Sequence, residues 1–223
     1  MANIKDQKSA VEETLSTQEA FFAKNKKAII YGVLAVVVII AGIIVYNTYV
    51  SAPREDKAST ILAKGQQLFG EEQFEKALNG DKAGFPGLLS VASEYGSTDA
   101  GNLANLYAGL CYANLGKWNE AAQYIEKFDS KGDFMISPAA EGALGNAYAH
   151  LNQLDKAVKH LTNAAEKADN NSLSPTFLVQ AGEILESQGK AEEALKLYQK
   201  VKTKYFNSMQ YQSIDKYIER VTK

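Results

Sequence analysis

Histidine and cysteine, the side chains that most often bind metals or act as nucleophiles, are scarce in this chain. Its two histidines, His150 and His160, are ten residues apart, and no cysteine or carboxylate cluster stands at metal-ligand spacing from them. The lone cysteine, Cys111, cannot form a disulfide within the chain. It lies between Leu110 and Tyr112, which indicates an inert packed thiol rather than a nucleophile. These residues predict no metal site.

Carboxylate pairs and the common catalytic motifs give no sign of an active site either. The pairs Glu71-Glu72 and Glu192-Glu193 fall at predicted solvated corners, whereas acid–base carboxylates need a cleft. The sequence has no Gly-x-Ser-x-Gly, no phosphate-binding Gly-rich loop and no His-Glu-x-x-His. We therefore expect no enzymatic activity and no cofactor.

A pattern of glycine, a large apolar or aromatic residue and alanine recurs along the chain. Its copies are Gly109, Tyr112 and Ala121; Gly145, Tyr148 and Ala157; Gly182, Leu185 and Ala194; and, more faintly, Gly65, Leu68 and Ala77. Glycine and alanine are always twelve residues apart, although successive glycines are 44, 36 and 37 residues apart. A constant interval inside units of variable spacing indicates an internal repeat of helical hairpins with looped junctions. The glycine and alanine are predicted to lie where the two helices of a hairpin approach closely.

These units resemble the tetratricopeptide repeat (TPR) family. The family unit is a helix-turn-helix with a Gly-x-x-Tyr element in its first helix and a small residue opening its second. Gly109-x-x-Tyr112 and Gly145-x-x-Tyr148 match directly, and the other two copies carry leucine in place of tyrosine. The resemblance implies an all-α, TPR-like helical-hairpin solenoid of about four hairpins over residues 54–206.

In this family the first helices line a concave face, and ligand contacts come from positions one, four and five after the helix glycine. The resemblance therefore implies a partner-binding groove formed by Leu110, Asn114, Asn146, His150, Glu183 and Ser187, with Ala113, Ala149 and Glu186 beside them. The alternative is that each residue is merely solvated. As a set they describe a polar groove poor in basic residues, which does not support a lysine-rich clamp for carboxylate tails.

Composition and charge fit a folded, all-α chain. Apolar residues make up 46% of the sequence, prolines number only four, and glycines fall mostly at inferred turns. The formal net charge of −2 divides into +1 for residues 1–27 and −3 for residues 54–223. Because a mildly acidic solenoid lacks the excess of positive charge that binds a phosphate backbone, we expect no nucleic acid partner.

One long stretch, residues 28–53, contains no charged residue. As a helix, Ala28 to Val50 would span ~34 Å, enough for a hydrocarbon core of ~30 Å. We therefore expect a transmembrane helix over residues 28–50, in contact with the lipid bilayer. A cleavable signal peptide is the competing interpretation, but the apolar run is longer than a signal peptide requires and it begins late.

Positive charges flank this predicted span unequally. Lys24, Lys26 and Lys27 precede it, whereas Arg54 and Lys57 follow it. The excess predicts that residues 1–27 are a short cytoplasmic tail and that the solenoid is periplasmic, with the span in a bacterial inner membrane. A capping box at residues 16–19 also predicts a helix that starts near Thr17.

Two further segments complete the expected architecture. The Gly-rich stretch 79–87 interrupts the first hairpin, and either side of it could supply that hairpin's second helix. Near the C-terminus, Ile214, Tyr217, Ile218 and Val221 form an apolar stripe at helical spacing. Because repeat arrays need a polar-backed terminal helix, residues 207–223 are expected to form a C-terminal capping helix.

A short cytoplasmic tail, one uncleaved anchor and an exported TPR solenoid together resemble the ancillary subunits of the bacterial SecYEG translocon. The resemblance implies a non-catalytic protein–protein interaction scaffold. Its partners would be translocon subunits, a periplasmic chaperone or exported client polypeptides. The alternative is a structural TPR scaffold in envelope or secretion-system assembly, with a fixed protein partner.

Overall fold

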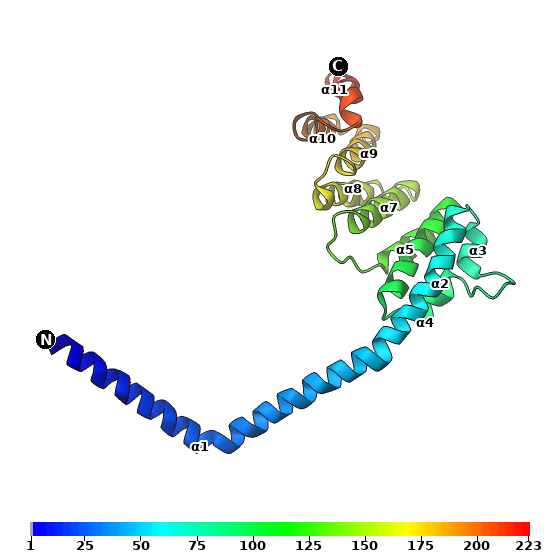
Figure 1. Cartoon of the computed structure of the whole chain (residues 1–223). Helices are drawn as coiled ribbons and strands as arrows, with labels where there is room; N and C mark the ends of the chain where they lie inside the picture. The colour runs from blue at the N-terminus through cyan, green and yellow to red at the C-terminus, as the bar shows by residue number, and fades with distance from the viewer. Residues whose placement is uncertain (1) are drawn as a thin grey trace. The chain divides into compact units, whose positions relative to one another are not determined.

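The computed structural model describes the backbone of residues 2–223 and the side chains of residues 21, 22 and 24–223. Every regular element in the described backbone is helical, so the predicted all-α class is confirmed. Contacts divide the chain into two compact units, Met1–Pro53 and Arg54–Lys223, and Figure 1 labels most of their helices. We refer to the second as the repeat unit.

The first unit contains helix α1 (Ala2–Tyr46) and the π-helical turn η1 (Asn47–Ser51). The helix begins at Ala2, so the start expected near Thr17 is wrong. Residues 2–16 contain no glycine or proline, so no residue there opposes the helix. The side chains of the expected capping box lie outside the described ones.

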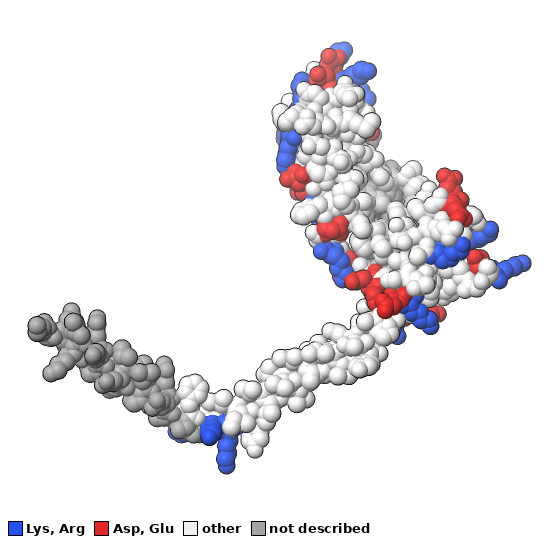
Figure 2. Space-filling view, viewed as in Figure 1, with Lys and Arg blue, Asp and Glu red and all other residues white. Residues whose placement is uncertain are grey.

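Among the described residues one helix is long and apolar enough to cross a membrane. Its most apolar window has a mean hydropathy of 3.1, and none of that window is buried. Large apolar side chains are exposed on all sides of it, among them Val38 at 70% and Ile39 at 61%. Figure 2 shows this stretch without blue or red side chains, whereas charged side chains lie at both of its ends.

The repeat unit is a stack of helical hairpins. The first helices of the hairpins are α2 (Ala52–Gly70), α5 (Asp99–Asn114), α7 (Ile136–His150) and α9 (Ser174–Ser187). The second helices of the last three hairpins are α6 (Trp118–Glu126), α8 (Leu154–Ala168) and α10 (Ala191–Lys204). Three clusters of buried apolar side chains follow one another along this stack and hold the hairpins together.

Every hairpin turn uses the same backbone conformation. The residue in the middle of the turn has a positive φ, which is +58° at Glu72, +71° at Gly116, +57° at Asn152 and +73° at Gly189. Glycine adopts this conformation without strain and asparagine at modest cost. The glutamate in the first turn is the exception, and it belongs to the hairpin whose repeat pattern is the faintest.

The predicted close approach of the two helices is confirmed in the central hairpins. A Cβ atom placed on Gly109 would lie 3.0 Å from the carbonyl oxygen of Ala121, and one on Gly145 would lie 3.2 Å from that of Ala157. Both alanines are fully buried. In the fourth hairpin a Cβ atom on Gly182 would instead contact the ring of Tyr198, a large side chain on the second helix.

The first hairpin departs from this pattern because its second helix is split. The two pieces are α3 (Phe74–Asn79) and α4 (Leu88–Glu94), on either side of the Gly-rich loop. A Cβ atom on Gly65 would lie 2.5 Å from Leu88 Cδ2, so the piece after the loop faces the first helix. The predicted approach of Gly65 to Ala77 is therefore wrong, although Ala77 is buried in the same core cluster.

A short 3₁₀ turn, η2 (Gln210–Ser213), leads into the last helix, α11 (Ile214–Thr222). Ile214 is fully buried, and the other members of the predicted stripe, Tyr217, Ile218 and Val221, pack against the last core cluster. The apolar stripe is therefore confirmed. The helix itself begins at Ile214, several residues later than the start of the predicted capping segment.

Candidate functional site

A cavity of about 450 Å³ opens on the first helices of the second, third and fourth hairpins. We call this cavity the groove. Helices α5 and α7 supply most of its lining, α6 contributes its first residue, and α9 contributes one residue. The groove is lined by Leu110, Ala113, Asn114, Trp118, Ala143, Asn146, Ala149, His150 and Gln180.

The positions predicted on α5 and α7 all line this groove. They are Leu110, Ala113 and Asn114 after Gly109, and Asn146, Ala149 and His150 after Gly145. Residues three and four apart lie on one face of a helix, so positions one, four and five after each glycine point the same way. Two stacked first helices therefore present these six side chains to one cavity.

The positions predicted on α9 do not line the groove. Glu183 and Ser187 are exposed, and neither is among the lining residues. Glu186 is paired with Arg220 of α11, whose Nε and Nη2 donate to its carboxylate at 2.6 and 2.8 Å. Of the residues on α9, only Gln180 lines the groove.

Two aromatic rings form a flat wall of the groove. Trp118, the first residue of α6, stacks on His150, the last residue of α7. The ring centroids are 3.7 Å apart and the planes differ by 2°. This stacking restricts both side chains and offers a rigid apolar surface to a ligand. The sequence shows Trp118 only as part of a turn, so its role in the groove was not predicted.

The amide side chains in the groove differ in how far they are satisfied. Asn114 Nδ2 already donates to the carbonyl oxygen of Leu110 at 2.9 Å. The Oε1 atom of Gln180 is buried and has no hydrogen-bond partner in the described structure. A buried acceptor without a donor costs about 1–3 kcal/mol. Because this oxygen is shut off from solvent, a ligand in the groove cannot reach it either. The polar groups that the groove offers to a ligand are therefore those of the other lining side chains, among them Asn146 and His150.

Formal charge is absent from the residues that line the groove. None of them is Asp, Glu, Lys or Arg, and His150 is counted as neutral. Among the described residues no group of three or more His, Cys, Asp or Glu could hold a metal ion. The lining can therefore recognise a molecule by hydrogen bonds and apolar contacts, and it offers no acid–base pair.

The other residues with reactive side chains are committed to the fold. His160 Nδ1 lies 2.9 Å from Glu141 Oε1, and Lys167 donates to Glu141 Oε2 at 3.0 Å. Burial raises the pKa of Glu141, but its bonds to Lys167 and His160 outweigh burial and hold that pKa below its usual value. Cys111 is fully buried, which confirms the packed thiol, and burial raises its pKa to about 12, which disfavours the reactive thiolate.

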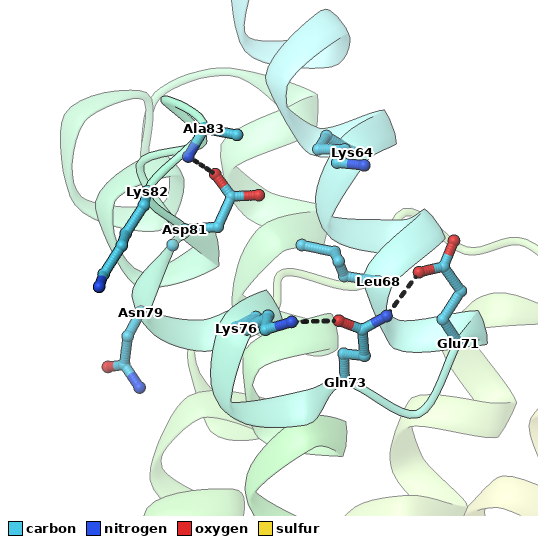
Figure 3. Close-up of a pocket in the computed structure, with 10 residues that line it drawn as sticks. Lys64, Leu68, Glu71, Gln73, Lys76, Asn79, Asp81, Lys82 and Ala83 are labelled. Carbon is cyan, nitrogen blue, oxygen red and sulfur yellow. Dashed lines mark hydrogen bonds between the residues drawn. The ribbon is translucent and has the colours of Figure 1, made fainter.

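A larger cavity, of about 810 Å³, lies where α2 ends and α3 begins (Figure 3). Its polar side chains already bind one another: Gln73 donates to Glu71 at 2.8 Å and accepts from Lys76 at 2.8 Å. Asp81 accepts from the backbone N–H of Ala83 at 2.9 Å. Because these groups are satisfied and their charges are mixed, the groove is the better candidate for a binding site.

The stacked hairpins, their turns and the groove define a repeat scaffold of the TPR class. The family model of the tetratricopeptide repeat-like domain matches residues 19–215, so the chain belongs to this family. A search of curated protein sequences found no significant match.

Solved structures give the same fold. The chain is similar to a Podosopora anserina protein described as a kinesin light chain with nearly identical TPR-like repeats. The TM-score is 0.56 at 14% identity, over 73% of this chain and 83% of that one. It is also similar to MamA, with a TM-score of 0.54 at 16% identity, over 74% of this chain and 91% of that one. At these identities the likeness establishes the fold alone.

Proposed function

We propose that this protein is a non-catalytic scaffold that binds segments of other polypeptides in the groove. The observation that carries the proposal is the uncharged groove, in which the polar side chains Asn114, Asn146 and His150 of two stacked first helices line one cavity. A polypeptide main chain supplies N–H donors and carbonyl acceptors at regular intervals, which suits neutral amide side chains. TPR-like scaffolds of this family imply protein partners in general.

We further propose that residues 28–50 anchor the protein in a bacterial inner membrane, with residues 1–27 in the cytoplasm and the repeat unit in the periplasm. The exposed, uncharged helix supports the anchor, since its apolar side chains have no protein cover in the described structure. The lysines before the span support the orientation.

Protease added to spheroplasts is therefore expected to digest residues 54–223 and to leave the anchor with the membrane. The positive charges on the N-terminal side keep that end inside, so the repeats are accessible from outside. The measurement is immunoblotting of the protected fragments. A repeat unit that stays intact until the membrane is dissolved would contradict the orientation.

The proposed partners are translocon subunits, a periplasmic chaperone or exported client chains. A photo-crosslinking residue in place of Asn146, inside the groove, is expected to capture them in intact cells. The matched control places it at Lys196, which is exposed on α10 and outside the groove. Adducts with translocon subunits and emerging chains support this assignment, whereas one abundant envelope protein supports the structural scaffold. Equal yields of the same adducts from Asn146 and Lys196 would show that partners do not bind in the groove.

A further inference from the structure

A second cavity adjoins the groove and differs from it in chemistry. It measures about 250 Å³ and is lined only by apolar residues: Leu106, Leu110, Met135, Ile136, Ala139 and Ala140. We call it the apolar pocket. Leu106 and Ala140 are buried and form its floor, whereas Met135 and Ile136 are exposed at 55% and 48%. Leu110 lines both cavities, so they meet at this side chain.

The rim of the apolar pocket is held in place by Asp133. Its Oδ1 accepts from the backbone N–H groups of Met135 and Ile136, at 2.8 and 2.5 Å. Its Oδ2 accepts from the hydroxyl of Ser137 at 2.6 Å. Chiefly through the Ser137 hydrogen bond, the pKa of Asp133 is lowered to about 2, so the carboxylate that fixes the rim is charged at neutral pH. The hydrogen bonds of Asp133 thus fix the backbone that carries the exposed side chains of Met135 and Ile136.

The charge of the two cavities limits what can occupy them. None of the residues that line either one is Asp, Glu, Lys or Arg. A charged side chain placed here would lose water without gaining an opposite charge, whereas an apolar side chain would gain by leaving water. Methionine is flexible and adapts to apolar side chains of different shapes.

We propose that the apolar pocket takes one large apolar side chain, such as leucine, from an uncharged, extended polypeptide segment whose main chain lies along the groove. The inference rests on the proposed function and names the class of segment that the groove selects. The main chain of the segment meets the amide side chains of Asn114 and Asn146, and one of its side chains enters between α5 and α7. Segments with acidic or basic residues at that position are rejected.

The test uses the full-length protein in lipid nanodiscs and short synthetic peptides of serine, glycine and asparagine. One peptide carries a central leucine, the second a central alanine and the third a central aspartate. Trp118 is the one tryptophan of the chain and lines the groove, so its fluorescence reports occupancy directly. The leucine peptide is expected to bind about tenfold more tightly than the alanine peptide, and the aspartate peptide most weakly.

Two variants address the apolar pocket itself. Met135→Gln keeps the shape of the side chain but makes it polar, and Ala139→Leu fills the cavity from an exposed position. Each is expected to bring the leucine peptide close to the alanine peptide and to leave the alanine peptide unchanged. The matched control is Met209→Gln, because Met209 is 82% exposed and lines neither cavity. It is expected to change nothing.

The outcomes separate this inference from the proposed function. If leucine and alanine peptides bind equally to the unchanged protein, the groove remains a polypeptide site and the apolar pocket is not its selector. A leucine preference that survives both Met135→Gln and Ala139→Leu overturns the inference in the same way. If no peptide binds and Trp118 does not respond, the proposed function and the inference fall together. Sedimentation that shows a dimer abolished by Met135→Gln assigns the pocket to a second copy and also overturns the inference.

Discussion

Replacing Ala157 with leucine is expected to destabilise the repeat unit by about 1–3 kcal/mol, because the added atoms have no room between α7 and α8. Ala157 is fully buried, and its carbonyl oxygen lies 3.2 Å from where a Cβ on Gly145 would stand. For a unit of this size each kcal/mol lowers the melting temperature by about 2–4 °C. Thermal unfolding of residues 54–223, followed by circular dichroism, measures the change.

The control for this prediction lies two residues further along the same helix. Lys159 is exposed, so Lys159→Leu introduces the same side chain without forcing it between the two helices. We expect its free energy of unfolding to stay within about 0.5 kcal/mol of that of the unchanged protein, as for ordinary surface substitutions. Equal losses for the two leucine variants would mean that α7 and α8 do not approach at Gly145 and Ala157.

The repeat pattern predicted this part of the fold well because the twelve-residue interval is a packing constraint. A helix glycine and the alanine of the next helix can share one close approach only if the intervening turn has a fixed length. The pairs Gly109–Ala121 and Gly145–Ala157 satisfy this condition. In the first hairpin the loop splits the second helix, so the alanine at the right interval is not the residue that faces Gly65. Sequence spacing alone does not show which piece of an interrupted helix turns back.

The groove was predicted in part, and its residues show why. Positions after the glycines of α5 and α7 follow from helical periodicity, so the six expected residues lie together. Gln180 was missed because it precedes its helix glycine by two positions, the place that Ala143 occupies on α7. Both Ala143 and Gln180 lie two positions before a helix glycine, so this shared position is the sequence signal that could have identified Gln180. Glu186 was assigned to the groove because the sequence gives no sign that Arg220 of the terminal helix reaches it.

The apolar pocket lies further from what a repeat pattern can predict. Met135 lies in the junction between two hairpins, and Ile136 is the first residue of α7. The repeat pattern specifies no residue type at either position. Their position depends on the hydrogen bonds that Asp133 makes with this junction. These hydrogen bonds join residues that are close in sequence. The apolar pocket, however, also needs Leu106 and Leu110 of α5, which belong to the preceding hairpin.

Removing the polar side chains of the groove is expected to weaken partner binding more than any change of the same size on the second helices. In the variant Asn114→Ala, Asn146→Ala, His150→Ala, the groove loses two amides and one face of its aromatic wall. If these contacts belong to the few that dominate binding, the loss is about 1–3 kcal/mol. Anisotropy of a labelled client peptide, measured against the full-length protein, reports it.

The same variant is expected to remain folded, with only a small fall in melting temperature. Its three side chains are exposed or half-buried, and the stability lost comes mainly from the Trp118–His150 stack, which contributes about 0.5–1.5 kcal/mol. The matched control is Gln123→Ala, Lys159→Ala, Lys196→Ala, three exposed residues on α6, α8 and α10. We expect this control to bind the peptide with unchanged affinity. Unchanged binding by the groove variant would place the partner site elsewhere on the repeat unit, since the backbone that carries these side chains would still be intact.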